Sequence, residues 1–295
     1  MQIDILTTVI LPFSLFLIMF GMGLSLKITD FRAVLKFPKA VGLGLIAQML
    51  MLPSIAFVVA IVFKLPTELA VGLMIIALAP GGATSNMFSY LFKGDVALSI
   101  TLTAIVGLIA PFSIPLVVAF SMNYFGDGTA SFQMPIIKTI TQLLLITVIP
   151  VILGMVVLKF WPVISSKIEK VLKWLSMVFM FVIIALITIK NWDKMGQFYA
   201  DVGLATLVLN LIVLTLGFYS AKWFSLTRKQ SITIGFEVGI QNGTLAMVVA
   251  GTLIGNPTMM IPAITYGLMM FVTGTIFGWV VTQKDQIQVP AVKVE

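Results

Sequence analysis

The chain has 295 residues, of which 60% are hydrophobic and only 10% are charged, a composition too apolar for a soluble domain. The absence of cysteine and histidine excludes disulfides, thiolate metal sites and imidazole bases, which removes most hydrolytic mechanisms. The net charge of +7 is spread over short segments between apolar runs, so it does not form the basic face of a nucleic-acid-binding protein.

Nine apolar segments are long enough to cross a bilayer, which requires about 20 residues for a core about 30 Å thick. We therefore predict an all-α polytopic membrane protein that forms a single domain over residues 1–295. The predicted spans are 6–26, 39–63, 69–91, 96–122, 135–160, 171–190, 203–225, 229–254 and 259–283. The first span lacks a basic leader and a clear cleavage site, so we interpret it as a helix and not as a signal peptide.

The basic residues are divided unequally between the two sides of this arrangement. Fourteen of the 18 fall in one set of alternate loops and in the C-terminal tail, namely Lys27, Arg32, Lys36, Lys39, Lys93, Lys159, Lys167, Lys170, Lys173, Lys222, Arg228, Lys229, Lys284 and Lys293. The other loops contain Lys64, Lys138, Lys190 and Lys194. The positive-inside rule predicts an inner (plasma) membrane protein with its N-terminus outside and its C-terminus in the cytoplasm.

Two of the spans are interrupted by glycine and polar residues. The third contains "LAPGGATSNMF" (residues 78–88), and the eighth contains "FEVGIQNGT" (residues 236–244). These spans are five apart and cross the membrane in opposite directions. Paired interruptions of this kind favour an inverted-repeat transporter with a binding site near the bilayer midplane, although the Pro-Gly-Gly alone could be a structural kink.

Glu237 is the one acidic residue well inside a predicted span. A carboxylate in the membrane costs several kcal/mol unless it is paired or solvated, and no basic residue shares its span. The compensating charge could be a bound cation; the alternative is a protonated side chain hydrogen-bonded between helices. Ser99 and Thr103 share one helix face that could meet Ser85 and Asn86, and their oxygens suit alkali cations, although such hydroxyls commonly serve packing alone.

"MFGMGLSL", "PGGATSNMFSYLFKGDVALS" and "EVGIQNGTLA" resemble the signature segments of the bile acid:sodium symporter family, in matching order over nearly the whole chain. The resemblance implies a panel domain (6–26, 135–160 and 171–190) and a core domain (39–122 and 203–283) in which the two broken helices cross. It also implies two sodium ions, with Glu237 serving both. One site would use Ser85, Asn86, Ser99, Thr103 and Glu237; the other would use Gln48, Glu237 and Gln241 with the backbone carbonyls of Val238 and Ile240.

The resemblance places the substrate between panel and core, near Thr84 and Asn242. Several bacterial members carry a Trp-His-Asn run in the last helix, where this chain has Met269, Met270 and Phe271. An apolar wall formed by Met270 and Phe271 favours an organic anion with a large apolar body, such as a bile-acid-like carboxylate or sulfonate.

We therefore predict a sodium-coupled importer of an organic anion that works by alternating access and is not an enzyme. Beyond the substrate and the lipid bilayer, no obligatory protein partner is expected. A proton-coupled or sodium–proton exchanging transporter that uses Glu237 is the first alternative, and an intramembrane enzyme is the second.

Overall fold

The computed structural model describes residues 5–126, 135–190, 196–197 and 199–283. Every regular element in these ranges is a helix, as predicted. The physical reason is that apolar segments surrounded by lipid must satisfy their backbone hydrogen bonds internally. The tail from residue 284, predicted to be cytoplasmic, lies outside the described residues.

The first described part of the chain ends at residue 126. Its elements are η1 (Leu6–Ile10), α1 (Leu11–Gly23), η2 (Ile28–Arg32), α2 (Ala33–Lys36), α3 (Pro38–Ile46), η3 (Ala47–Met51), α4 (Leu52–Val62), α5 (Thr67–Leu78), α6 (Ala83–Leu91) and α7 (Val96–Phe125). The elements α3, η3 and α4 follow one another without interruption, so they form one rod with a π-helical turn in its middle.

The second part begins at residue 135. Its elements are α8 (Ile136–Leu143), η4 (Leu144–Val148), α9 (Ile149–Phe160), α10 (Pro162–Lys190), η5 (Tyr199–Gly203), α12 (Leu204–Trp223), α13 (Arg228–Gly239), α14 (Gly243–Met247), η6 (Val248–Leu253), η7 (Thr258–Met260) and α15 (Ile261–Gln283). Here too, α8, η4 and α9 form one continuous rod.

Six helices among the described residues are long and apolar enough to cross a membrane, and two bent pairs raise the number to eight. The bent pairs are Thr8–Gly23 with Ile28–Lys36, at 79°, and Thr67–Leu78 with Ala83–Leu91, at 62°. The chain is therefore a multi-pass membrane protein. The sixth predicted span, 171–190, falls within the 29-residue helix α10, and the arrangement of nine spans in inverted repeats stays a prediction.

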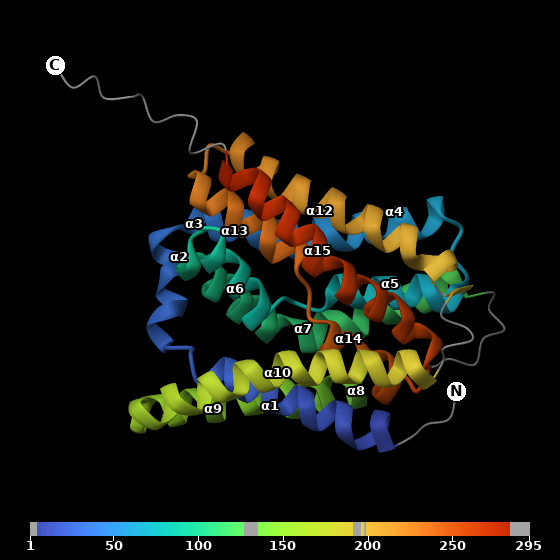
Figure 1. Ribbon diagram of the computed structural model, residues 1–295, viewed down its shortest axis with the longest axis horizontal. Helices are drawn as coiled ribbons and strands as arrows, with labels where there is room; N and C mark the ends of the chain where they lie inside the picture. Colours follow the sequence, from blue (N-terminus) through green and yellow to red (C-terminus); the bar gives the residue numbers. More distant parts are fainter. Residues whose placement is uncertain (1–4, 127–134, 191–195, 198, 284–295) are drawn as a thin grey trace.

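Helices α1, α8, α9 and α10 lie together along one side of the molecule, and most of the remaining helices form the larger group on the other side (Figure 1). Glycines allow α1 and α9 to approach backbone to backbone. A Cβ atom on Gly23 would collide with the backbone of Val151, and one on Gly154 would collide with the carbonyl of Phe20. The smaller group contains the segments expected to form the panel, and their movement as a domain remains a prediction.

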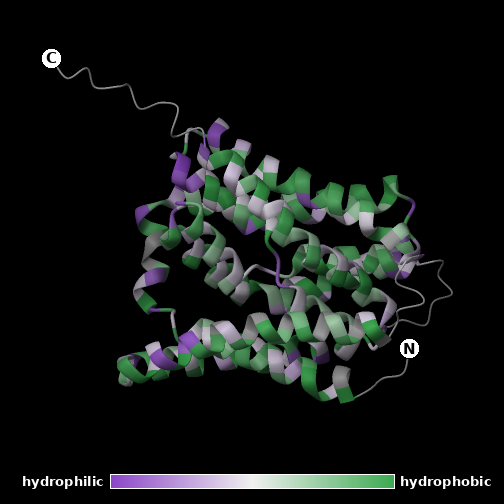
Figure 2. Ribbon diagram, in the orientation of Figure 1, coloured by the Kyte–Doolittle hydropathy of each residue, from purple (hydrophilic) through white to green (hydrophobic). Residues whose placement is uncertain are grey.

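Two helices are broken at the centre of the molecule, at the two places where the sequence predicts interruptions. Residues 79–82 separate α5 from α6, and residues 240–242 separate α13 from α14. The two breaks touch, because the backbone N–H of Asn242 donates to the carbonyl of Ala79 at 3.3 Å. Figure 2 shows the break between α13 and α14 as a hydrophilic segment inside largely hydrophobic helices.

Candidate functional site

Glu237 lies two residues before the end of α13 and is completely buried. One carboxylate oxygen, Oε1, accepts a hydrogen bond from the Ser99 hydroxyl at 2.6 Å, and Oε2 accepts one from the Thr103 hydroxyl at 2.9 Å. Both hydroxyls come from α7, where their spacing of four residues puts them on one helix face. The carboxylate therefore faces hydroxyl groups, and the described residues give it no ion pair.

Asn86 brings the half-helix α6 into the same cluster. Its Oδ1 lies 2.7 Å from the Ser99 hydroxyl oxygen and 3.5 Å from that of Thr103. The preceding Ser85 is also buried, and its hydroxyl exchanges hydrogen bonds with the backbone of Gly82 at the start of α6. Three separate elements, α6, α7 and α13, thus place the oxygens predicted for the first sodium site around one point.

This cluster contains more oxygen acceptors than hydrogens to satisfy them. Ser99 and Thr103 each carry one hydroxyl proton, yet each lies within hydrogen-bonding distance of both Asn86 and Glu237. Hydroxyl, amide and carboxylate oxygens are the ligands that hard cations prefer. The described residues contain no group of three or more acidic, histidine or cysteine side chains. A single carboxylate among neutral oxygens therefore suits a monovalent cation better than a divalent one.

A second set of polar atoms lies beside the end of α13. Gln48, on η3, is only 3% exposed, and within the part of the chain that the structure describes neither its side-chain oxygen nor its nitrogen has a hydrogen-bond partner. The Gln241 Nε2 donates to the carbonyls of Glu237 and Val238, at 3.1 and 2.7 Å, which leaves its buried Oε1 without a partner. Since η3 packs against α13, both amides border the same half-helix.

The broken backbone supplies further acceptors at this place. Among the described residues, no hydrogen bond reaches the carbonyl of Ile240, which lies in the break. A buried polar group without a partner costs about 1–3 kcal/mol, so several together call for an explanation. A bound cation would satisfy such oxygens, and Gln48, Gln241 and Ile240 are all among the ligands predicted for the second sodium site.

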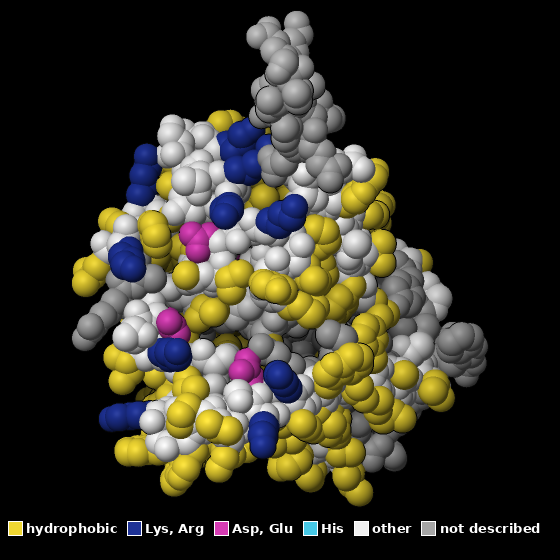
Figure 3. All heavy atoms as spheres, turned by 60° about the vertical axis from the view of Figure 1, so that its left-hand side comes forward, with side chains coloured by type: hydrophobic (Ala, Val, Ile, Leu, Met, Phe, Trp, Pro, Cys, Tyr) yellow, Lys and Arg dark blue, Asp and Glu magenta, His cyan; other side chains and the backbone are white. Residues whose placement is uncertain are grey.

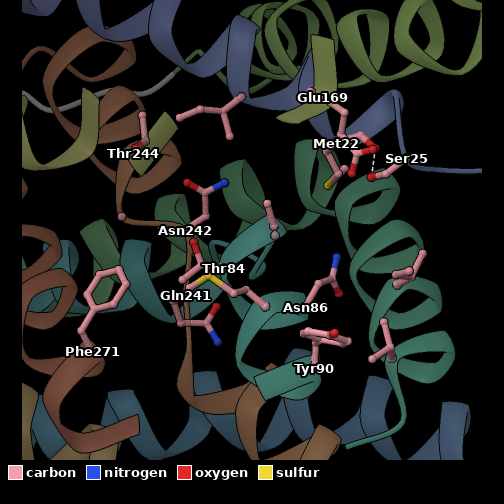
Figure 4. Close-up of a pocket in the computed structure, with 18 residues that line it drawn as sticks. Met22, Ser25, Thr84, Asn86, Tyr90, Glu169, Gln241, Asn242, Thr244 and Phe271 are labelled. Carbon is pink, nitrogen blue, oxygen red and sulfur yellow. Dashed lines mark hydrogen bonds between the residues drawn. The ribbon is translucent and has the colours of Figure 1, made fainter. Parts of the chain in front are cut away.

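A cavity of about 460 Å³ lies beside the crossing of the two breaks (Figure 4). It separates α1 and α10 from α6 and the start of α14, and it is lined by Ile18, Gly21, Met22, Ser25, Gly82, Ala83, Thr84, Asn86, Met87, Tyr90, Val96, Ile100, Glu169, Gln241, Asn242, Gly243, Thr244 and Phe271. Thr84, in the first turn of α6, and Asn242, in the break before α14, both line this cavity and lie next to each other in the view (Figure 4).

Met270 and Phe271, the two apolar residues predicted to contact the substrate, lie in different surroundings. Phe271 lines the cavity, whereas Met270 does not and is only 1% exposed. Consecutive residues on a helix point about 100° apart, so α15 can turn one of these side chains towards the cavity and the other into the core. Met270 packs in the core, and its predicted contact with the substrate stays a prediction.

The sequence reasoning missed two polar residues of the cavity. Thr244, in the first turn of α14, follows directly after the motif that contains Asn242, and this proximity was the available signal. Glu169 lies between the fifth and sixth predicted spans; in the structure it lies on α10 and reaches the cavity near Met22 and Ser25 (Figure 4). No pattern around Glu169 distinguishes it from the solvated charges beside it.

The charged residues around the cavity belong to one end of the molecule. Loops and helix ends there carry exposed Lys27, Lys36, Lys39, Lys159, Lys167, Lys170, Lys222 and Lys229. Figure 3, which brings this end forward, shows Lys and Arg side chains around a hollow. Because Ser25 and Glu169 line the cavity and lie near these lysines, the cavity extends from the crossing of the breaks towards the basic end.

A lone buried carboxylate among hydroxyl and amide oxygens, placed where two broken membrane helices cross, is the arrangement of an ion-coupled secondary transporter. A family model described as "Sodium Bile acid symporter family" matches residues 12–198. The chain belongs to this family of sodium-dependent transporters and is not an enzyme.

Several known proteins are similar in sequence to this protein over most of its length. The uncharacterized sodium-dependent transporter YocS of Bacillus subtilis is 29% identical, over 89% of this chain and 79% of its own. The human hepatic sodium/bile acid cotransporter is 28% identical, over 83% of this chain and 70% of its own. The probable sodium/metabolite cotransporter BASS1, chloroplastic, of Arabidopsis thaliana is 26% identical, over 88% of this chain but only 63% of its own.

Proposed function

We propose that this protein is a symporter that uses sodium to import an organic anion by alternating access. The observation that carries the proposal is Glu237, which is buried without an ion pair among the described residues and faces Ser99 and Thr103 at the crossing of two broken helices. A bound Na⁺ would supply the positive charge that this carboxylate lacks. The family and the printed names of several relatives support sodium as the coupling ion.

Two sodium ions are proposed, with Glu237 between them. The first would be held by Ser85, Asn86, Ser99, Thr103 and Glu237. The second would be held by Gln48, Gln241 and Glu237 with the carbonyls of Val238 and Ile240; it is supported by the unpartnered amide atoms of Gln48 and Gln241.

The cavity beside the crossing would hold the anion. The described lining contains no Lys or Arg, so the anionic group would be bound by Thr84, Asn242 and backbone N–H groups at the start of α6. The apolar body would contact Ile18, Met22 and Phe271. These contacts support a carboxylate or sulfonate with a substantial apolar part, and bile-acid-like compounds fit this description.

The direction of transport follows from the membrane potential. Each Na⁺ that enters contributes about 2.3 kcal/mol per 100 mV, so two sodium ions entering with one monovalent anion carry net positive charge inwards and can concentrate the anion. The basic end of the molecule would face the cytoplasm of a cell whose inner (plasma) membrane holds the protein. The cavity extends towards that end, so the structure would correspond to a state open to the cytoplasm.

Uptake into proteoliposomes tests the proposal. An imposed inward sodium gradient should drive accumulation of a taurocholate-like anion, whereas an equal potassium gradient or a pH gradient should not. Uptake driven by the pH gradient would instead show proton coupling through Glu237. If pantoate or pyruvate competes with the reporter better than taurocholate-like anions do, the argument for an apolar substrate body fails.

A further inference from the structure

The carbonyl of Gly239, the last residue of α13, receives hydrogen bonds from two other helices. Asn210 Nδ2, on α12, donates to it at 2.7 Å, and the hydroxyl of Tyr266, on α15, donates to it at 2.9 Å. The last carbonyls of a helix have no partner within the helix and need outside donors. Two side-chain donors on one such carbonyl hold this peptide group in a single orientation.

The donors are themselves held in place. The Thr273 hydroxyl, about two turns further along α15 than Tyr266, donates to Asn210 Oδ1 and also lies 2.9 Å from the carbonyl of Met269. This bond fixes which end of the Asn210 amide faces Gly239. Asn210, Tyr266 and Thr273 are all buried, at 0%, 1% and 7% exposure. Polar side chains buried in a membrane bundle are costly, and neither sodium site nor the cavity uses these three.

The orientation of the Gly239 peptide determines where the next carbonyl points. Ile240 is extended, with φ −106° and ψ 104°, and the carbonyls on either side of an extended residue point in roughly opposite directions. The Gly239 carbonyl faces α12 and α15. Accordingly the Ile240 carbonyl faces away from them, towards the other break, where it lies 2.8 Å from the position that a Cβ atom on Gly81 would occupy.

We propose that Asn210, Tyr266 and Thr273 are positioning residues for the second sodium site. By holding the Gly239 carbonyl on the side of α12 and α15, they direct the carbonyl of Ile240 to the opposite side, where it is available to a cation. This inference rests on the proposed function, because it assigns a role towards the sodium ion that the function requires. These three residues would not contact the ion. They would act through hydrogen bonds that orient the backbone next to a ligand.

The test measures sodium-dependent thermal stabilisation of the purified full-length protein, with choline chloride keeping the ionic strength constant. Tyr266→Phe removes one hydroxyl and keeps the ring. The sodium concentration for half-maximal stabilisation should rise by up to about tenfold, the limit reached when the hydrogen bond, worth about 0.5–1.5 kcal/mol, stabilises only the sodium-bound state. Thr273→Val should act in the same direction and provides a second variant if Tyr266→Phe does not fold.

Thr265→Val is the matched control. Thr265 neighbours Tyr266 on α15 and is equally buried, but its hydroxyl donates only to carbonyls of its own helix, those of Ile261 and Pro262. Thr265→Val should leave the sodium concentration for half-maximal stabilisation unchanged. If Tyr266 has a purely structural role, Tyr266→Phe will lower the unfolding temperature in sodium-free buffer. Its sodium concentration for half-maximal stabilisation (the sodium midpoint) will then equal that of the control.

A double-mutant comparison locates the effect. Tyr266→Phe should be non-additive with Gln241→Leu, at the second site, and additive with Thr103→Val, at the first. If the wild-type protein is stabilised by sodium but Tyr266→Phe has the sodium midpoint of Thr265→Val, the positioning role is overturned and the proposed function stands. If the wild-type protein shows no stabilisation by sodium over choline, the proposed function is overturned and this inference with it.

Discussion

Glu237 shows how one side chain can require a ligand. Its carboxylate is fully buried and is hydrogen-bonded to Ser99 and Thr103, but hydroxyl groups are neutral. A buried charge costs several kcal/mol even after structural relaxation, and neutral hydrogen bonds offset only part of this cost. A bound cation would stabilise this charge, and this is the coupling between fold and sodium that we propose.

Replacing Glu237 tests this coupling. Glu237→Gln keeps the size of the side chain and removes its charge, so stabilisation by sodium should disappear. For the wild-type protein, mass action gives about 2.7 kcal/mol at a sodium concentration 100 times the dissociation constant. The measurement is the unfolding temperature with sodium and with choline.

Ser121→Ala provides the control for Glu237→Gln. It removes a buried hydroxyl on α7 that donates only to the carbonyl of Val117, in its own helix. Its response to sodium should equal that of the wild-type protein. If Glu237→Gln keeps the full sodium response, Glu237 is not a sodium ligand.

Substitutions of Gln48 and Gln241 test the second sodium site, and they should change the stability of the sodium-free protein in opposite directions. Neither polar atom of Gln48 has a partner, so Gln48→Leu should stabilise the sodium-free protein, by about 1–3 kcal/mol. Gln241 donates two hydrogen bonds, so Gln241→Leu should destabilise it. Both variants should raise the sodium concentration for half-maximal uptake and reduce its cooperativity. Unchanged sodium dependence in both would mean that these amides only fill space.

At the scale of the helices, the two breaks can approach closely because Gly81 has no side chain. Gly81 lies opposite Ile240 and Ser85, and its backbone does not have a positive φ. A glycine is needed here because the two segments approach closely, and no unusual backbone conformation is involved. The neighbouring Pro80 has no N–H to donate, which leaves α5 unable to continue through the break.

Gly81→Ala should push the breaks apart. The added Cβ would lie 2.8 Å from the Ile240 carbonyl oxygen and 2.9 Å from Ser85 Cβ, so one backbone segment must shift. We expect destabilisation by about 1–3 kcal/mol and a weaker response to sodium at both sites. The measurements are the unfolding temperature and sodium-dependent uptake.

Gly267→Ala provides the comparison on α15, because nothing lies within 4 Å of the Cβ atom that it would add. Alanine is the better helix former, so this change should be neutral or stabilise by up to about 1 kcal/mol. If both substitutions behave alike, close contact at Gly81 is not what holds the breaks together.

At the scale of the whole molecule, many exposed lysines lie at one end of the helix bundle. Figure 3 shows Lys and Arg side chains around a hollow, at the end opposite to the one where α1 begins (Figure 1). Such a distribution sets the orientation of a membrane protein during insertion. The same arrangement places the mouth of the cavity on the side predicted to be cytoplasmic.

Labelling of single cysteines tests this orientation, and the chain has no native cysteine to interfere. Lys138→Cys, at the start of α8, should react with a membrane-impermeant maleimide in intact cells. Lys167→Cys, near the start of α10 at the basic end, should react only after the membrane is permeabilised. Both positions are exposed to solvent or lipid. The reverse pattern would invert the topology and place the cavity mouth outside.

The amino-acid sequence was sufficient to predict the helical membrane class, the two interrupted segments and the position of a carboxylate, Glu237, inside a helix. These features depend on local rules, because lipid requires long apolar helices and makes an unpaired carboxylate or a Pro-Gly-Gly within them conspicuous. The predicted ligands Asn86, Ser99 and Thr103 could be related to Glu237 by helix spacing and family motifs.

Contacts between distant segments required the folded structure. Whether Met270 or Phe271 faces the cavity depends on how α15 is rotated against its neighbours, and hydropathy does not distinguish two adjacent apolar residues. The bonds from Asn210 and Tyr266 to Gly239 join three helices. Each partner lies in an ordinary apolar helix, so no periodic pattern marks it. These contacts exist because packing brings the end of α13 between α12 and α15, and packing is a property of the whole chain.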